Sequence, residues 1–176
     1  GCPVGIPIPE FLDQVAQGNI AAAYEILSNA NALPAISGRV CPQENQCEGK
    51  CVRGIKGEPV AIGRVERFVA DWAAQQGVAN TATAPKNGRK VAVIGPAGLT
   101  CAGELARMGY SVTVFEAFHL PGGVLTYGIP EFRLPKAIVA REVANLEKMG
   151  VEIQLNMVIG KVLTIPELFD MGYESV

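Results

Sequence analysis

The feature that most constrains the fold of this chain is an apolar run that ends in a glycine turn. The run V-A-V-I at residues 91–94 is continuous rather than alternating, which is typical of a strand buried on both faces of a parallel sheet. A helical pattern over residues 97–108 and a second apolar strand over residues 111–115 follow it. Strand, helix and strand at this spacing predict a βαβ unit. A further helix and strand are predicted over residues 136–149 and 151–155.

The turn after the first strand is a candidate nucleotide site. Dinucleotide-binding βαβ units use glycines here, so that a pyrophosphate can approach the backbone and sit on the helix N-terminus. Glu116 closes the second strand, where an acidic side chain accepts hydrogen bonds from ribose hydroxyls. The usual fingerprint, G-x-G-x-x-G, is longer than this turn, so the glycines alone also fit an ordinary tight strand–helix connection. The turn consists of Gly95, Pro96, Ala97 and Gly98.

A second glycine-rich segment, P-G-G-V-L-T-Y-G-I-P-E-F-R-L-P, is too hydrophobic for a plain surface loop. Gly122 and Gly123 permit close approach of the backbone to a ligand. Arg133 offers a forked donor that suits a phosphate or a ribose edge. The alternative is that Arg133 forms a surface ion pair with Glu131 or Glu142. The segment therefore strengthens the prediction of a bound nucleotide.

The front of the chain has a different character. Short helices are predicted over residues 10–17 and 20–28, and an amphipathic helix over residues 62–76. Residues 34–60 are punctuated by prolines and glycines and are expected to be irregular. Residues 77–89 are small and polar and are expected to form a linker or strap.

Five cysteines indicate metal or redox chemistry more than a disulfide framework, because their number is odd and no secretory feature accompanies them. Three of them lie in one loop-rich stretch, as cluster thiolates do. Zinc sites prefer two tight pairs, so the spacing favours an iron–sulfur cluster and leaves zinc open. Cys101 is expected to be a small buried residue facing the sheet. The cysteines are Cys2, Cys41, Cys47, Cys51 and Cys101.

Bulk composition excludes several classes of protein. Hydrophobic residues make up 49% and charged residues 18%, which is a globular composition. The net charge of −2 gives no basic footprint for nucleic acid or an anionic membrane. The longest apolar runs fall far short of the ~20 residues of a membrane helix, and no signal peptide is visible. A cytoplasmic location is expected.

Three blocks of the sequence resemble one family of flavoproteins. They are G-C-P-V-G-I-P-I-P-E-F, G-R-V-C-P-Q-E-N-Q-C-E-G-K-C and A-I-G-R-V-E-R-F-V-A-D-W. These blocks, with G-G-V-L-T-Y-G-I-P-E-F-R-L-P-K, are similar to the glutamate synthase (NADPH) small subunit family. The same module is found in the large subunit of NADH-dependent ferredoxin:NADP oxidoreductase and in dihydropyrimidine dehydrogenase.

The resemblance implies the ligands of a [4Fe-4S] cluster. Cys2, Cys41 and Cys47 are implied as three of them, and a side-chain oxygen of Glu66 as the fourth. From residue type alone, Glu66 between two arginines is a surface ion-pair partner. Cys51 is implied as a ligand of a second [4Fe-4S] cluster, whose other cysteines lie upstream of Cys2 in the family.

The resemblance also implies FAD in the second half of the chain, with NADPH used by the full-length protein. No catalytic acid or base is expected. The implied partner is a large glutamate synthase subunit or a ferredoxin-linked subunit. The family continues beyond Val176 into its NADPH-binding domain, so turnover by this chain alone is not expected. The implied FAD contacts are Gly95, Pro96, Ala97, Gly98, Glu116, Gly122, Gly123, Leu125, Arg133 and Ile159.

The predicted fold class is α+β, with an all-α iron–sulfur domain before part of a Rossmann-like α/β FAD-binding domain. The expected boundaries are residues 1–76, a linker at 77–89, and residues 90–176. The expected function is electron relay between FAD and [4Fe-4S] clusters in an oxidoreductase of the glutamate synthase type. The alternatives are a non-enzymatic relay or docking module with impaired flavin binding, and a zinc-stabilised structural module.

Overall fold

The computed structural model describes residues 1–95 and 98–176 and divides the chain into two compact units. Unit 1 comprises Gly1–Asn80 and unit 2 comprises Thr81–Val176. Each unit is described separately. In the described part of the chain, no helix combines the length and the apolar character needed to cross a membrane.

Unit 1 is helical. A helix that the sequence analysis missed begins at Pro34, where proline occupies the first helical position and its absent N–H costs no hydrogen bond. The expectation of an irregular segment over residues 34–60 is therefore wrong for residues 34–40, which are helical. It is correct for residues 41–60, which contain only two short 3₁₀ turns. The elements are α1 (Ile8–Ala16), α2 (Ile20–Ala30), α3 (Pro34–Val40), η1 (Gln43–Asn45), η2 (Val52–Ile55) and α4 (Ile62–Gln75).

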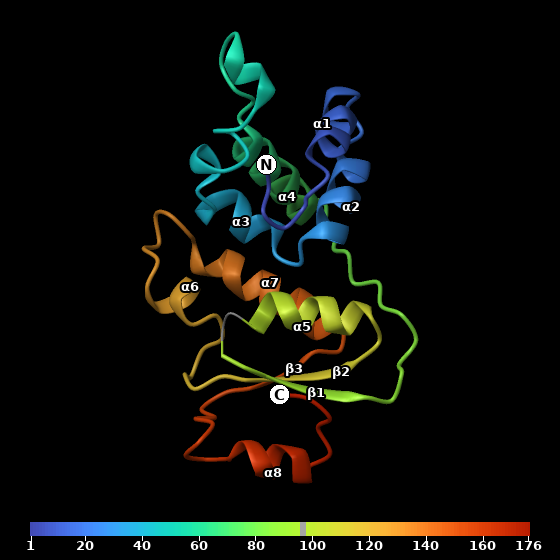
Figure 1. Cartoon of the computed structure of the whole chain (residues 1–176), viewed down its shortest axis with the longest axis vertical. Helices are drawn as coiled ribbons and strands as arrows, with labels where there is room; N and C mark the ends of the chain where they lie inside the picture. Colours follow the sequence, from blue (N-terminus) through green and yellow to red (C-terminus); the bar gives the residue numbers. More distant parts are fainter. Residues whose placement is uncertain (96–97) are drawn as a thin grey trace. The chain divides into compact units, whose positions relative to one another are not determined.

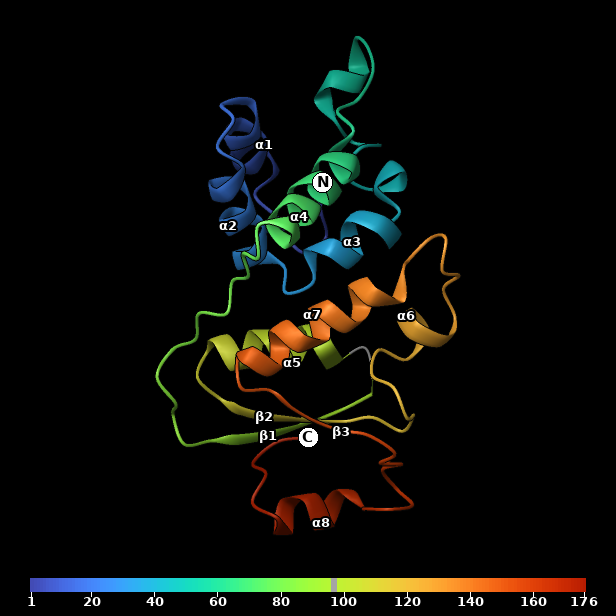
Figure 2. The same cartoon turned by 180° about the vertical axis from the view of Figure 1, so that it is seen from behind.

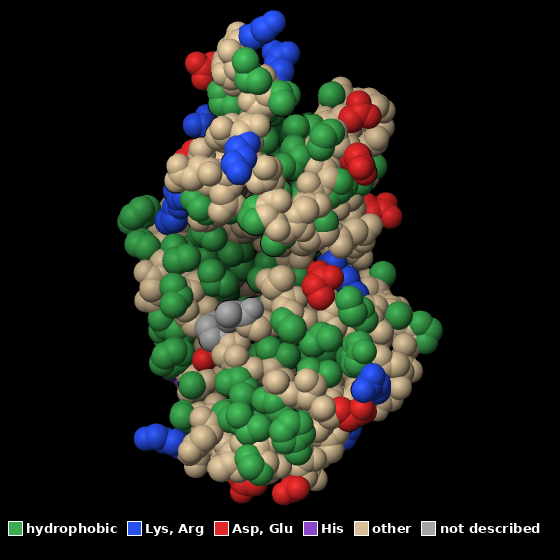
Figure 3. All heavy atoms as spheres, viewed as in Figure 1, with side chains coloured by type: hydrophobic (Ala, Val, Ile, Leu, Met, Phe, Trp, Pro, Cys, Tyr) green, Lys and Arg blue, Asp and Glu red, His purple; other side chains and the backbone are tan. Residues whose placement is uncertain are grey.

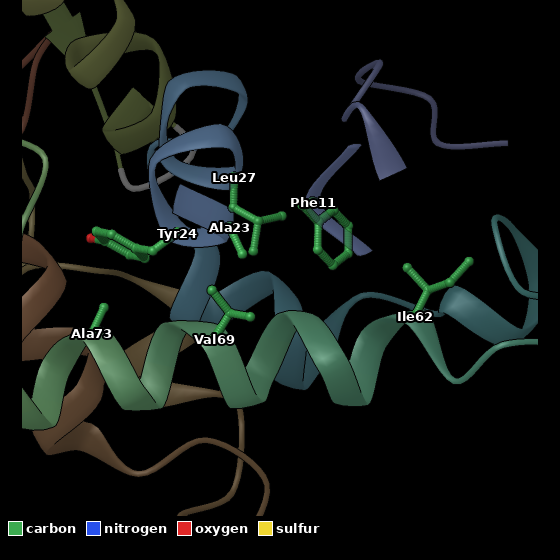
Figure 4. Packing of buried hydrophobic residues seen from close by; sticks show 7 residues of the cluster. All are labelled: Phe11, Ala23, Tyr24, Leu27, Ile62, Val69 and Ala73. Atoms are coloured by element: carbon green, nitrogen blue, oxygen red, sulfur yellow. The ribbon is translucent and has the colours of Figure 1, made fainter. Parts of the chain in front are cut away.

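The core of unit 1 forms where α1, α2 and α4 meet (Figure 4). Phe11 of α1, Leu27 of α2 and Val69 of α4 are fully buried there. On α4, buried Ile62 and Val69 lie on one face at helical spacing. Glu66 falls between them in the same register and is also buried. The apolar pattern of α4 thus carries a carboxylate into the interior of unit 1.

Unit 2 is a parallel sheet with helices on both faces. The strand order is β1-β2-β3, and Ile94 at the end of β1 pairs with Phe115 at the end of β2. Helices α5 and α7 cover one face and α8 lies on the other (Figures 1 and 2). The elements are β1 (Lys90–Ile94), α5 (Gly98–Arg107), β2 (Ser111–Phe115), α6 (Val124–Tyr127), α7 (Lys136–Lys148), β3 (Glu152–Gln154) and α8 (Ile165–Asp170).

The α8 side of the sheet has its own small core. Phe115 packs edge-on against Tyr173, with ring centroids 5.8 Å apart, and Leu168 of α8 is fully buried beside them. The outer face of α8 leaves Ile165 and Phe169 about half exposed, and apolar side chains gather over this segment in Figure 3. Thus α8 buries one face against the sheet and presents the other to its surroundings.

Helix α5 corrects one expectation and confirms the βαβ prediction. Leu99, Ala102 and Ala106 form its buried face. Cys101 lies off that face and is exposed, so the prediction of a buried thiol is wrong. Helical packing in unit 1 and a parallel sheet in unit 2 together confirm the predicted α+β class.

Candidate functional site

The loop of residues 41–51, which carries three cysteines, is tied to the helices on both sides. The side chain of Glu48 accepts a hydrogen bond from the backbone N–H of Gly63 at 2.9 Å, at the start of α4. The side-chain amide of Gln43 donates to the carbonyl of Ser37 in α3 at 3.0 Å. An otherwise irregular loop is thereby fixed between α3 and α4.

Two other thiols and the carboxylate of Glu66 lie within electrostatic reach of the Cys41 thiol in this loop. The pKa of Cys41 is raised by burial first, and then by the negative charges of Glu66, Cys47 and Cys2. The pKa of Cys47 is also raised, mainly by burial. Because Glu66, Cys47 and Cys2 all act on the Cys41 thiol, these side chains lie within electrostatic reach of it. Within residues 1–95 and 98–176, no three His, Cys, Asp or Glu side chains are close enough to hold a single metal ion.

Glu66 is the most unusual member of this group. Its side chain is 5% exposed, and burial raises the pKa of its carboxyl group. Oε1 accepts hydrogen bonds from Ser37 Oγ at 2.7 Å and from Asn31 Nδ2 at 3.3 Å. Among the described residues no donor reaches Oε2, and this oxygen is not completely enclosed by the protein. One carboxylate oxygen is therefore hydrogen-bonded, and the other is unbonded and accessible to a ligand.

Residue type alone gave the wrong environment for Glu66. The arginines expected to pair with it do not: Arg67 pairs with Asp71 at 3.6 Å, and Arg64 is exposed on another face of α4. A helix position three or four residues from buried apolar side chains faces the core, whatever its residue type. That spacing on α4 was the signal that could have placed Glu66 inside.

Cys51 lies at the far end of the loop and has a different environment. The pKa of the Cys51 thiol is lowered, mainly by the nearby backbone N–H groups of Val60, Arg53 and Gly54. Cys51 is partly exposed and carries no disulfide.

The side chains of this group fit the donor set of one [4Fe-4S] cluster. Cys2, Cys41 and Cys47 are free thiols. Glu66 adds an open carboxylate oxygen from the neighbouring helix, in a loop-rich setting of the type that holds such clusters. The four side chains are those that the sequence resemblance implied, and their individual roles as ligands stay a prediction.

Unit 2 places Gly95 and Glu116, two of the predicted nucleotide residues, directly after the carboxyl ends of β1 and β2. The backbone N–H of Gly95 donates to the carbonyl of Phe115 at 2.9 Å, which sets Gly95 beside the residue before Glu116. Gly95 has a φ of 83°, a conformation that favours glycine. A side chain on Gly98 would clash with Val93 of β1, so glycine allows α5 to pack closely on the strand. Pro96 and Ala97 lie outside the described residues.

Glu116, the predicted ribose acceptor, is buried directly after β2. It is 2% exposed, and Oε1 accepts the backbone N–H of Phe118 at 3.1 Å. In the described part of the chain, Oε2 receives no hydrogen bond and is not fully enclosed. A largely buried carboxylate with one unbonded oxygen at the end of the second strand suits the ribose hydroxyls of a nucleotide.

The second glycine-rich segment is held in place by a lysine. Lys136 Nζ donates to the carbonyl of Leu125 at 2.8 Å and to that of Ile129, and Glu131 accepts the Lys136 backbone N–H. Gly122 has a φ of 102°, and a Cβ there would lie 2.7 Å from the Thr126 hydroxyl oxygen. Gly122 is therefore required for the turn itself.

The remaining predicted contacts are spread around this segment. Gly123, also at positive φ, precedes α6. Arg133 is exposed and forms no ion pair with any residue that the structure describes, so the predicted alternative of an ion pair with Glu131 or Glu142 is not observed. Ile159 follows β3 and packs against the small core under α8. The structure brings Gly95 and Glu116 together, and among residues 1–95 and 98–176 it gives Arg133 no ion-pair partner.

Sequence reasoning missed three residues that shape these sites. Asn31 and Ser37 bond Glu66 from 35 and 29 positions away, and no local pattern announces such contacts. Lys136 ends the block G-G-V-L-T-Y-G-I-P-E-F-R-L-P-K that carries the resemblance, but it was assigned no role beyond the start of a helix. Its position directly after a glycine-rich segment was the available signal.

Comparison with known proteins matches the two parts of the chain to two different families. Residues 1–78 match the family described as dihydropyrimidine dehydrogenase domain II, 4Fe-4S cluster, and residues 95–139 match an NAD(P)-binding Rossmann-like domain. The glutamate synthase [NADPH] small chain of Halomonas elongata is 41% identical over 99% of this chain and 38% of its own length. That of Azospirillum brasilense is 41% identical over 95% of this chain and 36% of its own length.

A third relative is the NAD-dependent dihydropyrimidine dehydrogenase subunit PreT of Escherichia coli. It is 40% identical over 95% of this chain and 41% of its own length. This chain spans 27% to 41% of the length of the curated relatives it matches. The matches confirm the predicted resemblance over nearly the whole chain.

Proposed function

Because this chain belongs to the family of the glutamate synthase (NADPH) small chains and the PreT subunits, we propose that it is their electron-relay segment. In this proposal the chain holds one [4Fe-4S] cluster in unit 1 and FAD in unit 2. It is carried by the match of residues 1–78 to a 4Fe-4S cluster family, together with the position of Glu66, Cys47 and Cys2 within electrostatic reach of the Cys41 thiol. Residues 1–76 form the cluster domain, 77–89 the linker and 90–176 the front of the FAD-binding domain.

The residues of unit 1 supply ligands and shielding. When bound, a [4Fe-4S] cluster accepts and donates single electrons. Cys2, Cys41 and Cys47 supply thiolates and Glu66 supplies Oε2. The partial burial of these thiols limits access of water, which is one of the levers on cluster potential.

The residues of unit 2 supply binding and orientation. Gly95 and Gly98 leave room at the strand end for a pyrophosphate, and Glu116 accepts hydrogen bonds from the adenosine ribose. Gly122, Gly123, Leu125 and Arg133 hold the remainder of FAD, and Lys136 fixes their backbone. The protein contributes positioning here, while the hydride and electron chemistry belongs to the cofactor.

The activity of the whole protein is proposed from its similarity to these relatives. We propose that a longer form oxidises NADPH and passes electrons to a larger partner subunit, either a glutamate synthase large subunit or a ferredoxin-linked one. The five free thiols suit the reducing cytoplasm. The rival function of a relay or docking module with impaired flavin binding rests on the short G-P-A-G turn, and the zinc module on the cysteines alone.

Light-driven reduction tests the relay directly. The chain is reconstituted anaerobically with iron, sulfide and FAD, and the flavin is then photoreduced with a sacrificial donor. The expected result is a reduced-cluster electron paramagnetic resonance signal that grows with illumination and is absent from Cys47→Ala protein. A chain that binds FAD but gives no cluster signal contradicts the relay, and a chain that binds iron but no FAD favours the docking module.

A further inference from the structure

Glu66 is held by a small polar network inside unit 1. Ser37 Oγ donates to Glu66 Oε1 at 2.7 Å, and Asn31 Nδ2 lies 3.3 Å from the same oxygen. Asn31 Nδ2 also donates to Ser37 Oγ at 2.6 Å. Asn31 and Ser37 come from the α2–α3 connection and from α3, and Glu66 comes from α4. Three segments thus meet at one carboxylate oxygen.

The direction of each hydrogen bond in this network is determined by its neighbours. The backbone N–H of Leu33 donates to Asn31 Oδ1 at 3.0 Å, and because that N–H can only donate, the amide nitrogen of Asn31 must face Ser37. The Ser37 hydroxyl has one proton and three acceptors within reach, and Glu66 Oε1 at 2.7 Å is nearer than the carbonyls of Leu33 and Pro34 at 3.2 and 3.3 Å. The proton therefore points to Glu66.

The network saturates one carboxylate oxygen and leaves the other open. All the hydrogen bonds to the Glu66 side chain go to Oε1, and in the described residues Oε2 has no donor. A freely rotating carboxylate would offer either oxygen, or both, to a metal. Partners that fix a ligand's orientation are known to change metal affinity strongly when removed.

We propose that Asn31 and Ser37 are positioning residues that present Glu66 Oε2, and only Oε2, to one iron of the cluster. The proposal rests on the proposed cluster ligation by Glu66. Hydrogen bonds to Oε1 also withdraw electron density from the carboxylate, which makes it a weaker donor to iron. Hydrogen bonding to ligands is one of the levers on cluster potential, so loss of either bond is expected to lower the reduction potential.

The test compares four variants of the whole chain after anaerobic reconstitution. Ser37→Ala removes the hydroxyl, Asn31→Asp replaces the donating amide by a repelling oxygen, and Ser37→Thr restores a hydroxyl. Ser28→Ala is the control, because Ser28 is a buried serine of the same unit that bonds Glu25 and Asn80 instead of Glu66. The readouts are iron and sulfide content, the rate of cluster loss to a chelator, the g-values of the reduced cluster and its midpoint potential.

Ser37→Ala and Asn31→Asp are expected to lose the cluster about 10–100-fold faster than wild type, with shifted g-values and a lower midpoint potential. Ser37→Thr is expected to recover wild-type values, and Ser28→Ala to keep them. Wild-type g-values and potential in both Ser37→Ala and Asn31→Asp would overturn the inference while the cluster itself stands. A wild-type chain without a cluster would instead overturn the proposed function.

A cysteine at the ligand position separates positioning from folding. In Glu66→Cys protein the fourth ligand is a thiolate, so Ser37 has no carboxylate to orient. Adding Ser37→Ala to Glu66→Cys is therefore expected to change neither the g-values nor the chelator rate. An equal loss of cluster in both backgrounds would show that Ser37 only supports the fold, and would contradict the inference.

Discussion

One buried glutamate of unit 1 and one of unit 2 show the same arrangement of oxygens. Glu66 and Glu116 are 5% and 2% exposed, and in each Oε1 is hydrogen-bonded while Oε2 receives no donor among residues 1–95 and 98–176. They differ in what bonds Oε1. For Glu116 it is the backbone N–H of Phe118, two residues away. For Glu66 it is two side chains from other segments.

This difference separates a local site from a tertiary one. In a βαβ unit, an acidic residue at the end of the second strand lies at the nucleotide site. The loop residues that follow it can supply the backbone N–H that orients its carboxylate. An acid on the buried face of a helix has no such local donor, because the helical N–H groups are already bonded. The Glu66 arrangement therefore exists only when α2, α3 and α4 are assembled.

The largest expected effect comes from removing each carboxylate in turn. Glu66→Ala is expected to lose most of its iron and sulfide and to keep its affinity for FAD. Glu116→Ala is expected to keep its cluster and to bind FAD about 10–100-fold more weakly, because hydrogen bonds to a charged group contribute about 1.5–3 kcal/mol. Iron analysis and quenching of FAD fluorescence measure the two affinities.

Loss of both cofactors in either variant would show that the two sites are not independent, and would contradict the account. Glu25→Ala, an exposed glutamate of α2, controls for loss of a carboxylate in general.

A smaller effect is expected at Lys136, whose ammonium group holds the backbone of the second glycine-rich segment, residues 121–135, in place. Lys136→Met keeps the length of the side chain and removes the donor to the carbonyls of Leu125 and Ile129. FAD binding is expected to weaken by about tenfold, since one charged hydrogen bond to the backbone is worth about 1.5–3 kcal/mol and part of it is recovered from water. Lys148→Met, at the exposed end of the same helix, is the matched control. Equal affinities in the two variants would remove Lys136 from the site.

The smallest effect concerns stability without cofactors. Burial raises the pKa of Glu66 above its usual value of 4.5. The folded state therefore binds the proton more tightly than the unfolded state, and Glu66 adds stability at low pH that is lost as pH rises from the usual pKa through the raised one. At neutral pH, Glu66→Gln is expected to raise the free energy of unfolding of the cofactor-free chain and to flatten its pH dependence. Urea unfolding between pH 4 and 8 measures this, and a destabilised Gln variant would contradict it.

The two units also differ in how much the sequence could predict. The βαβ order, the strand ends and the position of Glu116 follow from local periodicity and are found as expected. In unit 1, α3 was missed because Pro34 begins a helix where prolines and glycines suggested a loop. Cys101 was misplaced because it was assigned to the sheet-facing side by residue type, whereas the buried face of α5 is formed by Leu99, Ala102 and Ala106.

The site in unit 1 was predicted by resemblance and not by pattern. Helical spacing on α4 could have placed Glu66 in the interior, but its partners could not be derived from the sequence. Asn31 and Ser37 are ordinary polar residues near helix ends, where their types are common for local reasons. Only the packing of α3 against α4 turns them toward Glu66. Long-range hydrogen bonds of this kind leave no period in the sequence.

The measurement that tests the central claim most directly is the iron and acid-labile sulfide content of the anaerobically reconstituted chain, with an electron paramagnetic resonance spectrum after reduction. The account predicts about four irons and four sulfides per chain and a reduced [4Fe-4S] signal. It predicts that Cys41→Ala abolishes both, whereas Cys101→Ala changes neither. Bound zinc in place of iron, or a chain that takes up no iron at all, would contradict it.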